Sequence, residues 1–126
     1  MTFRSYLDHL HATNQLLRLS IPISKTYQVA GVLKKLEPRP VLFENIRESS
    51  FRLAGNLFCS KAAFASYFGI PASGLIPLLA QAIDQRSPCP RVDVAPCQEV
   101  VELQPDLDSL PIPLHCEGDG GNYISA

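Results

Sequence analysis

The sequence lacks an excess of charge of either sign and any long apolar run. Its 11 Lys and Arg residues are balanced by 12 Asp and Glu, which gives a formal net charge of −1, and no basic face of the kind that contacts nucleic acid is evident. No apolar run approaches the roughly 20 residues of a membrane helix, and the N-terminal stretch MTFRSYLDHLH has no signal-peptide core. We therefore expect a cytoplasmic protein with no nucleic-acid partner and no integral membrane segment.

Common catalytic and cofactor motifs are also missing. The chain has no GxGxxG, GxxxxGK[ST], GxSxG or HExxH motif. Its four cysteines, Cys59, Cys89, Cys97 and Cys116, include no CxxC pair and match no common zinc spacing. We expect them to be free thiols that pack as small apolar side chains.

The composition is that of a globular chain. Of the 126 residues, 46% are hydrophobic and 18% are charged, which is enough for a real core and unlike a disordered chain. This length fits one domain or a piece of something larger.

The first half of the chain alternates between helical and extended patterns. Residues 3–15 show helical periodicity with Ser5 and Asp8 as a capping pair, and residues 16–23 alternate with period two, as an edge strand because of Pro22. A second helix follows, with Ser24 or Thr26 as its N-cap, Lys34 and Lys35 near its end, and Pro38 and Pro40 beyond it.

The middle of the chain reads as a hairpin followed by helices. PVLFENI and FRLAGNLF form the two strands, joined by a turn at 47–50. Ser60 caps a short helix that Gly69 closes, Ser73 opens another helix, and QEVVEL continues as a strand. The fold class is therefore α+β: a small mixed or antiparallel sheet with a central hairpin, packed by about four helices. We expect one core made of Tyr6, Leu10, Val29, Leu33, Phe43, Leu53, Leu57, Phe64, Leu79 and Ile83.

The densest polar cluster lies in the final stretch, LPIPLHCEGDGGNYISA, from Leu110 to Ala126. It has three interpretations. His115, Glu117 and Asp119 could hold a metal, or the Gly-Asp-Gly-Gly run could be a plain turn. Alternatively, the paired glycines could admit a strand beginning at Asn122 that lies flat against a planar ligand.

Several blocks in order give the chain a family resemblance. RSYLDHLHATNQLLRLSIPIS, YQVAGVLKKL, PVLFENI, AGNLF, GIP, CQEVVEL, DLDSLPIPLH and DGGNYISA together resemble the N-terminal region of the UbiD-family, 4-hydroxybenzoate carboxy-lyase-like decarboxylases. The resemblance implies reversible non-oxidative decarboxylation of aromatic or α,β-unsaturated acids. It also implies prenylated FMN, manganese and potassium as cofactors, a split β-barrel for the flavin, and homo-oligomers of the full-length enzyme.

The same resemblance assigns residues in this chain. The family's Glu–Arg–Glu group and metal ligands correspond to positions beyond Ala126, so no catalytic residue or metal ligand is expected here. The cofactor-binding positions are those whose backbone would run near the flavin: Ile124, Ser125 and Ala126. Gly120 and Gly121 match the turn before that strand, and the resemblance gives His115 and Asp119 a structural role.

Two functional hypotheses follow. The chain is either the N-terminal portion of a UbiD-like carboxy-lyase or a stand-alone, non-catalytic module that binds a separate catalytic subunit. In the first case residues 1–109 form the N-terminal α/β domain, and residues 110–126 form a linker and the first strand of a truncated barrel. The expected partner is the remainder of the enzyme or that catalytic subunit. We expect the chain alone to be inactive, and its end, 110–126, to be frayed or paired with another molecule.

Overall fold

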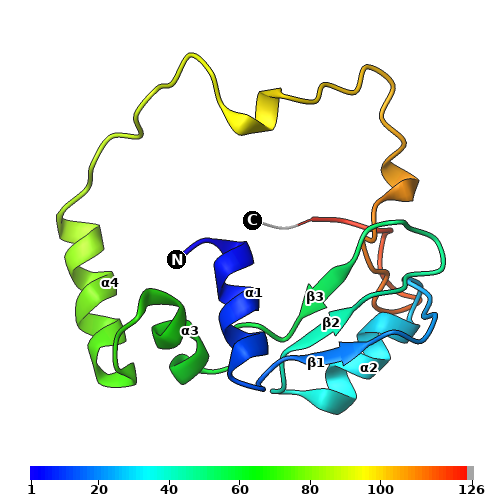
Figure 1. Ribbon diagram of the computed structural model, residues 1–126, viewed down its shortest axis with the longest axis horizontal. Coiled ribbons are helices and arrows are strands. Elements are labelled where there is room, and N and C mark those ends of the chain that lie inside the picture. The colour runs from blue at the N-terminus through cyan, green and yellow to red at the C-terminus, as the bar shows by residue number, and fades with distance from the viewer. Residues whose placement is uncertain (125–126) are drawn as a thin grey trace.

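The computed structural model describes residues 1–124 and shows an α+β fold, as predicted (Figure 1). Its helices are α1 (Phe3–Ala12), α2 (Gln28–Leu36), α3 (Lys61–Phe68) and α4 (Leu75–Asp84). Its strands are β1 (Leu17–Leu19), β2 (Val41–Phe43) and β3 (Leu53–Gly55). Three short 3₁₀ turns complete it: η1 (Ala72–Gly74), η2 (Pro96–Gln98) and η3 (Leu107–Ser109).

The sheet is small and mixed. The strand order is β1-β2-β3, with β1 parallel to β2 and β2 antiparallel to β3. The edge position of β1 and the pairing of the two hairpin strands confirm the sequence-based prediction. Each strand has only three residues. The chain bends soon after Leu19 and directly after Phe43, so the hydrogen-bonded ladder between β1 and β2 ends there. The apolar alternation in the sequence continues beyond Leu19, to Ile23.

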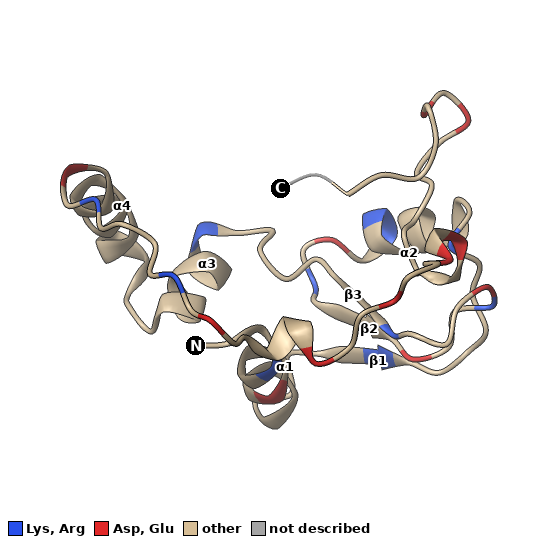
Figure 2. Ribbon diagram, turned by 90° about the horizontal axis from the view of Figure 1, so that it is seen from above, with Lys and Arg blue, Asp and Glu red and all other residues tan. Residues whose placement is uncertain are grey.

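The central strand β2 divides the core into two clusters. Leu42 packs on one face with Tyr6 and Leu10 of α1, whereas Val41 and Phe43 pack on the other face in the cluster that contains α2. Successive residues of a strand point to opposite faces, so a strand covered on both sides is apolar throughout. Figure 2 shows α1 and α2 on different sides of the sheet. The prediction of one core was therefore wrong.

The expected core residues divide according to this layering. Five of them are buried: Tyr6, Leu10, Val29, Phe43 and Leu57. Leu33 and Leu53 are half-buried. Three residues of α3 and α4 are exposed, at 39%, 41% and 64%: Phe64, Leu79 and Ile83. Helix α3 lies beside α1, and α4 lies on the other side of α3, away from the sheet (Figure 1), so no described layer covers their outer apolar face.

Two helix starts differ from the prediction. Thr2, not Ser5, is the N-cap of α1, and Ser5 completes a reciprocal capping box with it. Helix α1 ends before residue 15 because Asn14 adopts a positive φ of 56°. Helix α2 starts after Tyr27, which also has a positive φ of 63° and provides no side-chain cap. The hydroxyl of Ser24 donates to Glu48 instead of capping α2.

The ends of α3 follow the sequence signals closely, but the start of α4 does not. The Ser60 hydroxyl accepts from the Ala63 N–H at 3.1 Å, and Gly69 closes α3 in the left-handed conformation with φ 70°. Ser73 was predicted to open α4, but it lies within η1, and Gly74 precedes α4 with no side-chain cap.

Replacing Ser60 is expected to destabilise the chain more than replacing Ser73. Ser60→Ala removes a hydroxyl that satisfies a free N–H at the start of α3, which should lower the free energy of unfolding by about 0.5–2 kcal/mol. Ser73→Ala is the matched control, since Ser73 is exposed and caps nothing. Urea unfolding of both variants, followed by circular dichroism, measures the difference. Equal effects would contradict the capping role of Ser60.

The predicted strand QEVVEL does not form. Gln98 ends η2, and residues 99–103 are irregular and exposed; the side chains of Val100, Val101 and Leu103 are 80%, 71% and 89% exposed. A strand needs a neighbour for its backbone groups, and within residues 1–124 nothing lies beside this segment. Figure 1 shows this segment as part of the long arc that runs from α4 to the far side of the sheet.

Two further features concern the surface. All four cysteines are exposed and free, so they do not pack as the buried small residues that we expected. Within residues 1–124 no single helix is long and apolar enough to cross a membrane, and only α3 taken together with 72–84, across a bend of 86°, passes such a test. Acidic and basic residues are scattered along the chain (Figure 2).

Candidate functional site

The polar tail is attached to the α/β unit just before its cluster of charged residues. The N–H of Leu114 donates to the carbonyl of Lys25 at 3.0 Å, and the N–H of Tyr27 donates to the carbonyl of Leu114 at 2.9 Å. Together they form a parallel bridge between Thr26 and Leu114. The tail therefore leaves the fold from a fixed point next to the start of α2, so it is not frayed from Leu110 to Leu114; its pairing with another molecule stays a prediction.

A buried lysine strengthens this attachment. The ammonium of Lys25 donates to the carbonyls of Asp108 and, at 3.1 Å, Leu110. Lys25 is 9% exposed, and it is the one buried charged residue among residues 1–124. Sequence reasoning missed Lys25 because its partners lie 83 and 85 residues away, and the local stretch Ser-Lys-Thr looks like an ordinary polar turn.

Glu48 and Ser49 lie against the same junction. Glu48 accepts from the Ser24 hydroxyl and from the Lys25 N–H, the latter at 3.0 Å. These hydrogen bonds, the one from Ser24 first, hold the pKa of Glu48 below its ordinary value. The Ser49 hydroxyl donates to the carbonyl of Ser109 at 2.6 Å. Residues from the loop after β2 thus fix the segment that leads into the tail.

The cluster from His115 to Asp119 has the geometry of a closed turn. The carboxylate of Asp119 accepts from the N–H groups of His115 at 3.1 Å and Cys116 at 3.2 Å. Its other oxygen lies 3.3 Å from the Cys116 thiol, which donates to it. The thiol and these N–H groups hold the pKa of Asp119 below its ordinary value. Across residues 1–124 no three His, Cys, Asp or Glu side chains lie close enough to hold a metal ion.

Lowering the pH is expected to open this turn only below the ordinary range of an aspartate. A lowered pKa means that the carboxylate stabilises the turn above its unfolded pKa, and that this contribution is lost as the pH falls through the folded value. The amide NMR shifts of His115 and Cys116 should therefore titrate with a midpoint below 3.8. Asp119→Asn should remove the titration. If the titration step that Asp119→Asn removes has its midpoint at or above 3.8, this structure of the turn is contradicted.

The backbone from Gly120 to Ile124 differs in conformation from residue to residue and forms no strand. Gly121 has a positive φ of 133° with open space around its missing side chain, whereas Gly120 does not adopt a positive φ. The side chain of Asn122 donates back to the carbonyl of Ile112. Residues 122–124 are in no strand, contrary to the prediction, and Ile124 is 76% exposed. Ser125 and Ala126 lie outside the described residues.

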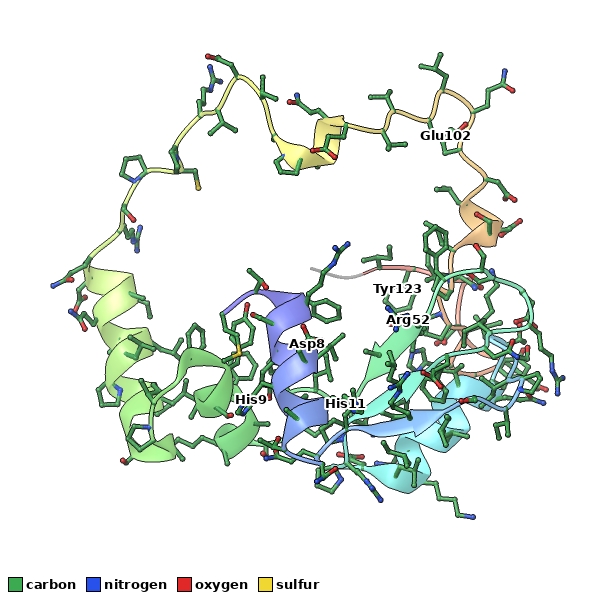
Figure 3. The ribbon with its side chains drawn as sticks, viewed as in Figure 1. Asp8, His9, His11, Arg52, Glu102 and Tyr123 are labelled. Carbon is green, nitrogen blue, oxygen red and sulfur yellow. The ribbon has the colours of Figure 1, made fainter. Side chains whose placement is uncertain are left out.

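A separate groove of about 790 Å³ lies between α1 and the sheet. Leu7, Leu16 and Leu42 contribute apolar lining, and Asp8 and His11 lie on the side of α1 that faces the sheet (Figure 3). His11 and the neighbouring His9 are exposed. No hydrogen bond joins Asp8 to His11 among the described contacts, so they do not form an acid–base pair.

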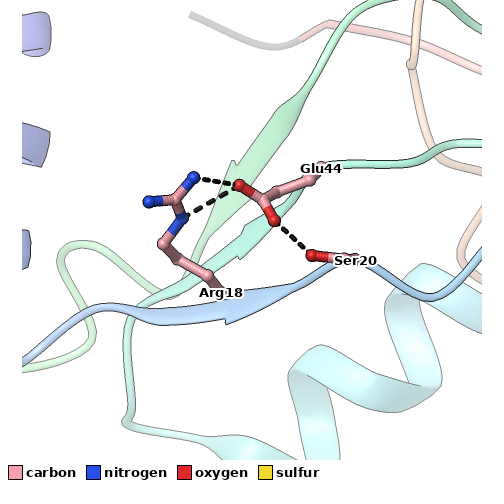
Figure 4. Close-up of polar contacts among 3 residues, drawn as sticks. All are labelled: Arg18, Ser20 and Glu44. Atoms are coloured by element: carbon pink, nitrogen blue, oxygen red, sulfur yellow. Dashed lines mark hydrogen bonds and ion pairs between the residues drawn. The ribbon is translucent and has the colours of Figure 1, made fainter.

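An ion pair stands at the rim of this groove. Glu44, after β2, accepts from the Arg18 Nε at 2.9 Å and from the Ser20 hydroxyl (Figure 4). These two hydrogen bonds, the one from Ser20 first, lower the pKa of Glu44. Because Arg18 is in β1, the pair links two neighbouring strands at the surface and leaves Arg18 less free to bind a ligand.

Comparison with known families gives two matches that together cover most of the chain. The N-terminal domain of 3-octaprenyl-4-hydroxybenzoate carboxy-lyase matches residues 7–83. The Rift-related domain of the same carboxy-lyase matches residues 90–126.

Curated relatives include two decarboxylases. Anhydromevalonate phosphate decarboxylase of Methanosarcina mazei is 32% identical over 126 residues, which cover 100% of this chain and 29% of that protein. Pyrrole-2-carboxylic acid decarboxylase of Pseudomonas aeruginosa is 30% identical over 143 residues, which cover 98% of this chain and 29% of that protein. The chain thus spans about 29% of the length of these relatives.

Solved structures share the fold. An evolved dimeric form of the UbiD-class enzyme HmfF from Pelotomaculum thermopropionicum, in complex with prFMN, matches with a TM-score of 0.85 at 30% identity, over 98% of this chain and 30% of that one. The vanillic acid decarboxylase of Sedimentibacter hydroxybenzoicus in its closed form matches with a TM-score of 0.78 at 25% identity, over 97% of this chain and 29% of that one.

Proposed function

The chain belongs to the UbiD family of 3-octaprenyl-4-hydroxybenzoate carboxy-lyases, and we propose that it is the N-terminal portion of a decarboxylase for an aromatic or α,β-unsaturated carboxylic acid. The reaction is reversible and involves no net oxidation of the substrate. The observation that carries the proposal is the collinear match of nearly the whole chain, in sequence and in fold, to a prFMN-bound enzyme of this class.

The chain's share of the cofactor site is small in this proposal. Prenylated FMN, when bound, supplies an electron sink for the carbanion that remains after CO₂ leaves. The backbone at 122–124 fits a position beside such a planar group, because it makes no backbone hydrogen bond to other described residues and Gly121 turns the chain without side-chain bulk. Ile124, Ser125 and Ala126 are the proposed contact residues.

The remaining parts of the site are assigned elsewhere. Residues 1–124 offer no cluster that fits manganese. The remainder of the enzyme would therefore supply the ligands of manganese, the ligands of potassium and the proton donor. In this proposal residues 1–109 form the α/β domain, and residues 110–126 form the linker and first barrel strand. We also propose that the complete enzyme is cytoplasmic and forms homo-oligomers.

The test joins this chain to the remainder of the Pseudomonas aeruginosa pyrrole-2-carboxylic acid decarboxylase, in place of the segment it matches there. With prenylated FMN, manganese and potassium, we expect CO₂ release from pyrrole-2-carboxylate, cinnamate- or hydroxybenzoate-type acids by the chimera, and none by the chain or the remainder alone. A chimera that is folded by circular dichroism and binds flavin, yet releases no CO₂, would contradict the proposal. Turnover by the chain alone would overturn the division of the site.

A further inference from the structure

The lysine buried beneath the tail has contacts that its burial requires. Taking an ammonium out of water is costly unless its N–H groups are bonded. Lys25 makes no ion pair among the described residues. Its hydrogen bonds go instead to main-chain carbonyls of Asp108 and Leu110. Main-chain carbonyls are present whatever the side chain, so Lys25 recognises the path of this segment rather than the identity of its residues.

The other contacts at this junction act on the same short segment. Ser49 bonds the carbonyl of Ser109, next to the two carbonyls that Lys25 binds. The main chain of Lys25 accepts from the N–H of Leu114, and Glu48 holds the N–H of Lys25 itself. The Lys25 latch, defined as these contacts of Lys25 and Ser49 with residues 108–114, therefore closes over one stretch of chain.

The chain before the latch provides no alternative anchor. Between residues 87 and 105 the hydrogen bonds are local ones within 95–99. If the contacts of the latch are lost, each residue of this stretch gains several accessible conformations. The place where the chain returns to the sheet thus depends on the latch.

The chain after the latch is tied to it. Asn122 donates its side-chain N–H to the carbonyl of Ile112, which lies between Leu110 and Leu114. The turn closed by Asp119 spans the residues in between. Because Leu110 and Leu114 are held in place and the turn is closed, the direction of the backbone at Asn122 depends on these contacts.

We propose that Lys25 is a positioning residue that sets the direction in which the backbone of residues 122–124 approaches the flavin site. The inference rests on the proposed function for the identity of that site, but the latch itself does not. Lys25 acts through the carbonyls of Asp108 and Leu110.

The first test measures hydrogen exchange in the 126-residue chain. Lys25→Met keeps an unbranched apolar side chain, one atom shorter than that of Lys, and removes its donors. The Leu114 and Tyr27 amides should then exchange at least about tenfold faster, while amides in β2 keep their rates within about twofold, because local opening exposes only the segment that opens. Lys35→Met is the matched control, since Lys35 is exposed on α2, and it should change neither set. Equal acceleration of all amides in Lys25→Met would overturn the latch.

A second variant covers a failure of Lys25→Met to fold. Ser49→Ala removes the hydroxyl that donates to Ser109 and also accepts from the Phe51 N–H at 3.1 Å, so it should accelerate the Leu114 and Phe51 amides but not those in β2. An unchanged Leu114 amide in Ser49→Ala would count against the proposal, as would a uniform acceleration.

The last test uses the chimera described under Proposed function, loaded with prenylated FMN. Lys25→Met should weaken flavin binding at least about tenfold and shift the flavin absorbance spectrum, and Lys35→Met should do neither. Unchanged flavin affinity and spectrum in Lys25→Met, despite faster exchange at Leu114, would overturn the positioning role and leave the proposed function standing. Absence of flavin from the unmodified enzyme would instead overturn the proposed function, and this inference with it.

Discussion

Phe43→Ala is expected to lower the free energy of unfolding by about 3–5 kcal/mol. Phe43 is fully buried in the cluster between β2 and α2, with Val29 and Ile23 among its partners. Truncation removes a large apolar side chain from water-free packing and leaves a cavity that the three-residue strand β2 has little freedom to close. Urea unfolding monitored by circular dichroism measures the loss.

Phe51→Ala is the matched control for this prediction. Phe51 lies before β3 and is 55% exposed, so the same chemical change there should cost less than about 1 kcal/mol, because little apolar area returns to water. Similar losses in the two variants would show that the cluster around Phe43 is not the core of this side of the sheet.

Tyr6→Ala is expected to have a comparable effect, about 3–5 kcal/mol, on the opposite side of the sheet. The ring of Tyr6 stacks on Phe58, with centroids 5.6 Å apart, and meets the edge of Tyr67 at 5.3 Å. Its hydroxyl donates to the carbonyl of Ala63 at 3.1 Å. The side chain therefore joins α1 to α3 by both packing and a hydrogen bond.

Tyr6→Phe separates the two contributions. It keeps the ring but removes the hydroxyl, so the expected loss is only about 0.5–1.5 kcal/mol. Burial raises the pKa of Tyr6 above 10.0. The neutral phenol therefore stabilises the fold below the unfolded pKa, and this contribution disappears as the pH rises through the folded value. The loss in alkali should be smaller in Tyr6→Phe, and an unchanged alkaline profile would contradict the burial of this hydroxyl.

Local chemistry in the sequence predicted the elements whose causes are local. Ser60 and Gly69 begin and end α3 as predicted, and the pairing of β2 with β3 follows from two apolar runs around a polar turn. Each case needs only residues within a few positions of one another. The α+β class could be derived for the same reason.

Where distant partners decide the structure, prediction from the sequence was less successful. Ser24 has the chemistry of an N-cap, but its hydroxyl is taken by Glu48, 24 residues away. Ser73 likewise has capping chemistry, but the preceding chain enters α4 through η1. The period of Leu75–Ile83 was helical as expected, yet periodicity alone cannot say whether another layer covers the apolar face.

The candidate site divides in the same way. The paired glycines predicted a turn before Asn122, and Gly121 has a positive φ there, a conformation that glycine adopts at no steric cost. The role of Lys25 was not, since its bonds to Asp108 and Leu110 follow from tertiary structure alone.

The two core clusters and the Lys25 latch differ in the sequence separation of their contacts, and this sets an order of folding during synthesis. Every buried residue of both clusters lies between Tyr6 and Leu57, so a ribosome has delivered the complete sheet core before half of the chain has emerged. The latch joins residues 83 and 85 positions apart, and contacts of such high separation form late. The nascent chain can thus complete its α/β core first, and it closes the latch only when the residues that lead to the tail have left the ribosome.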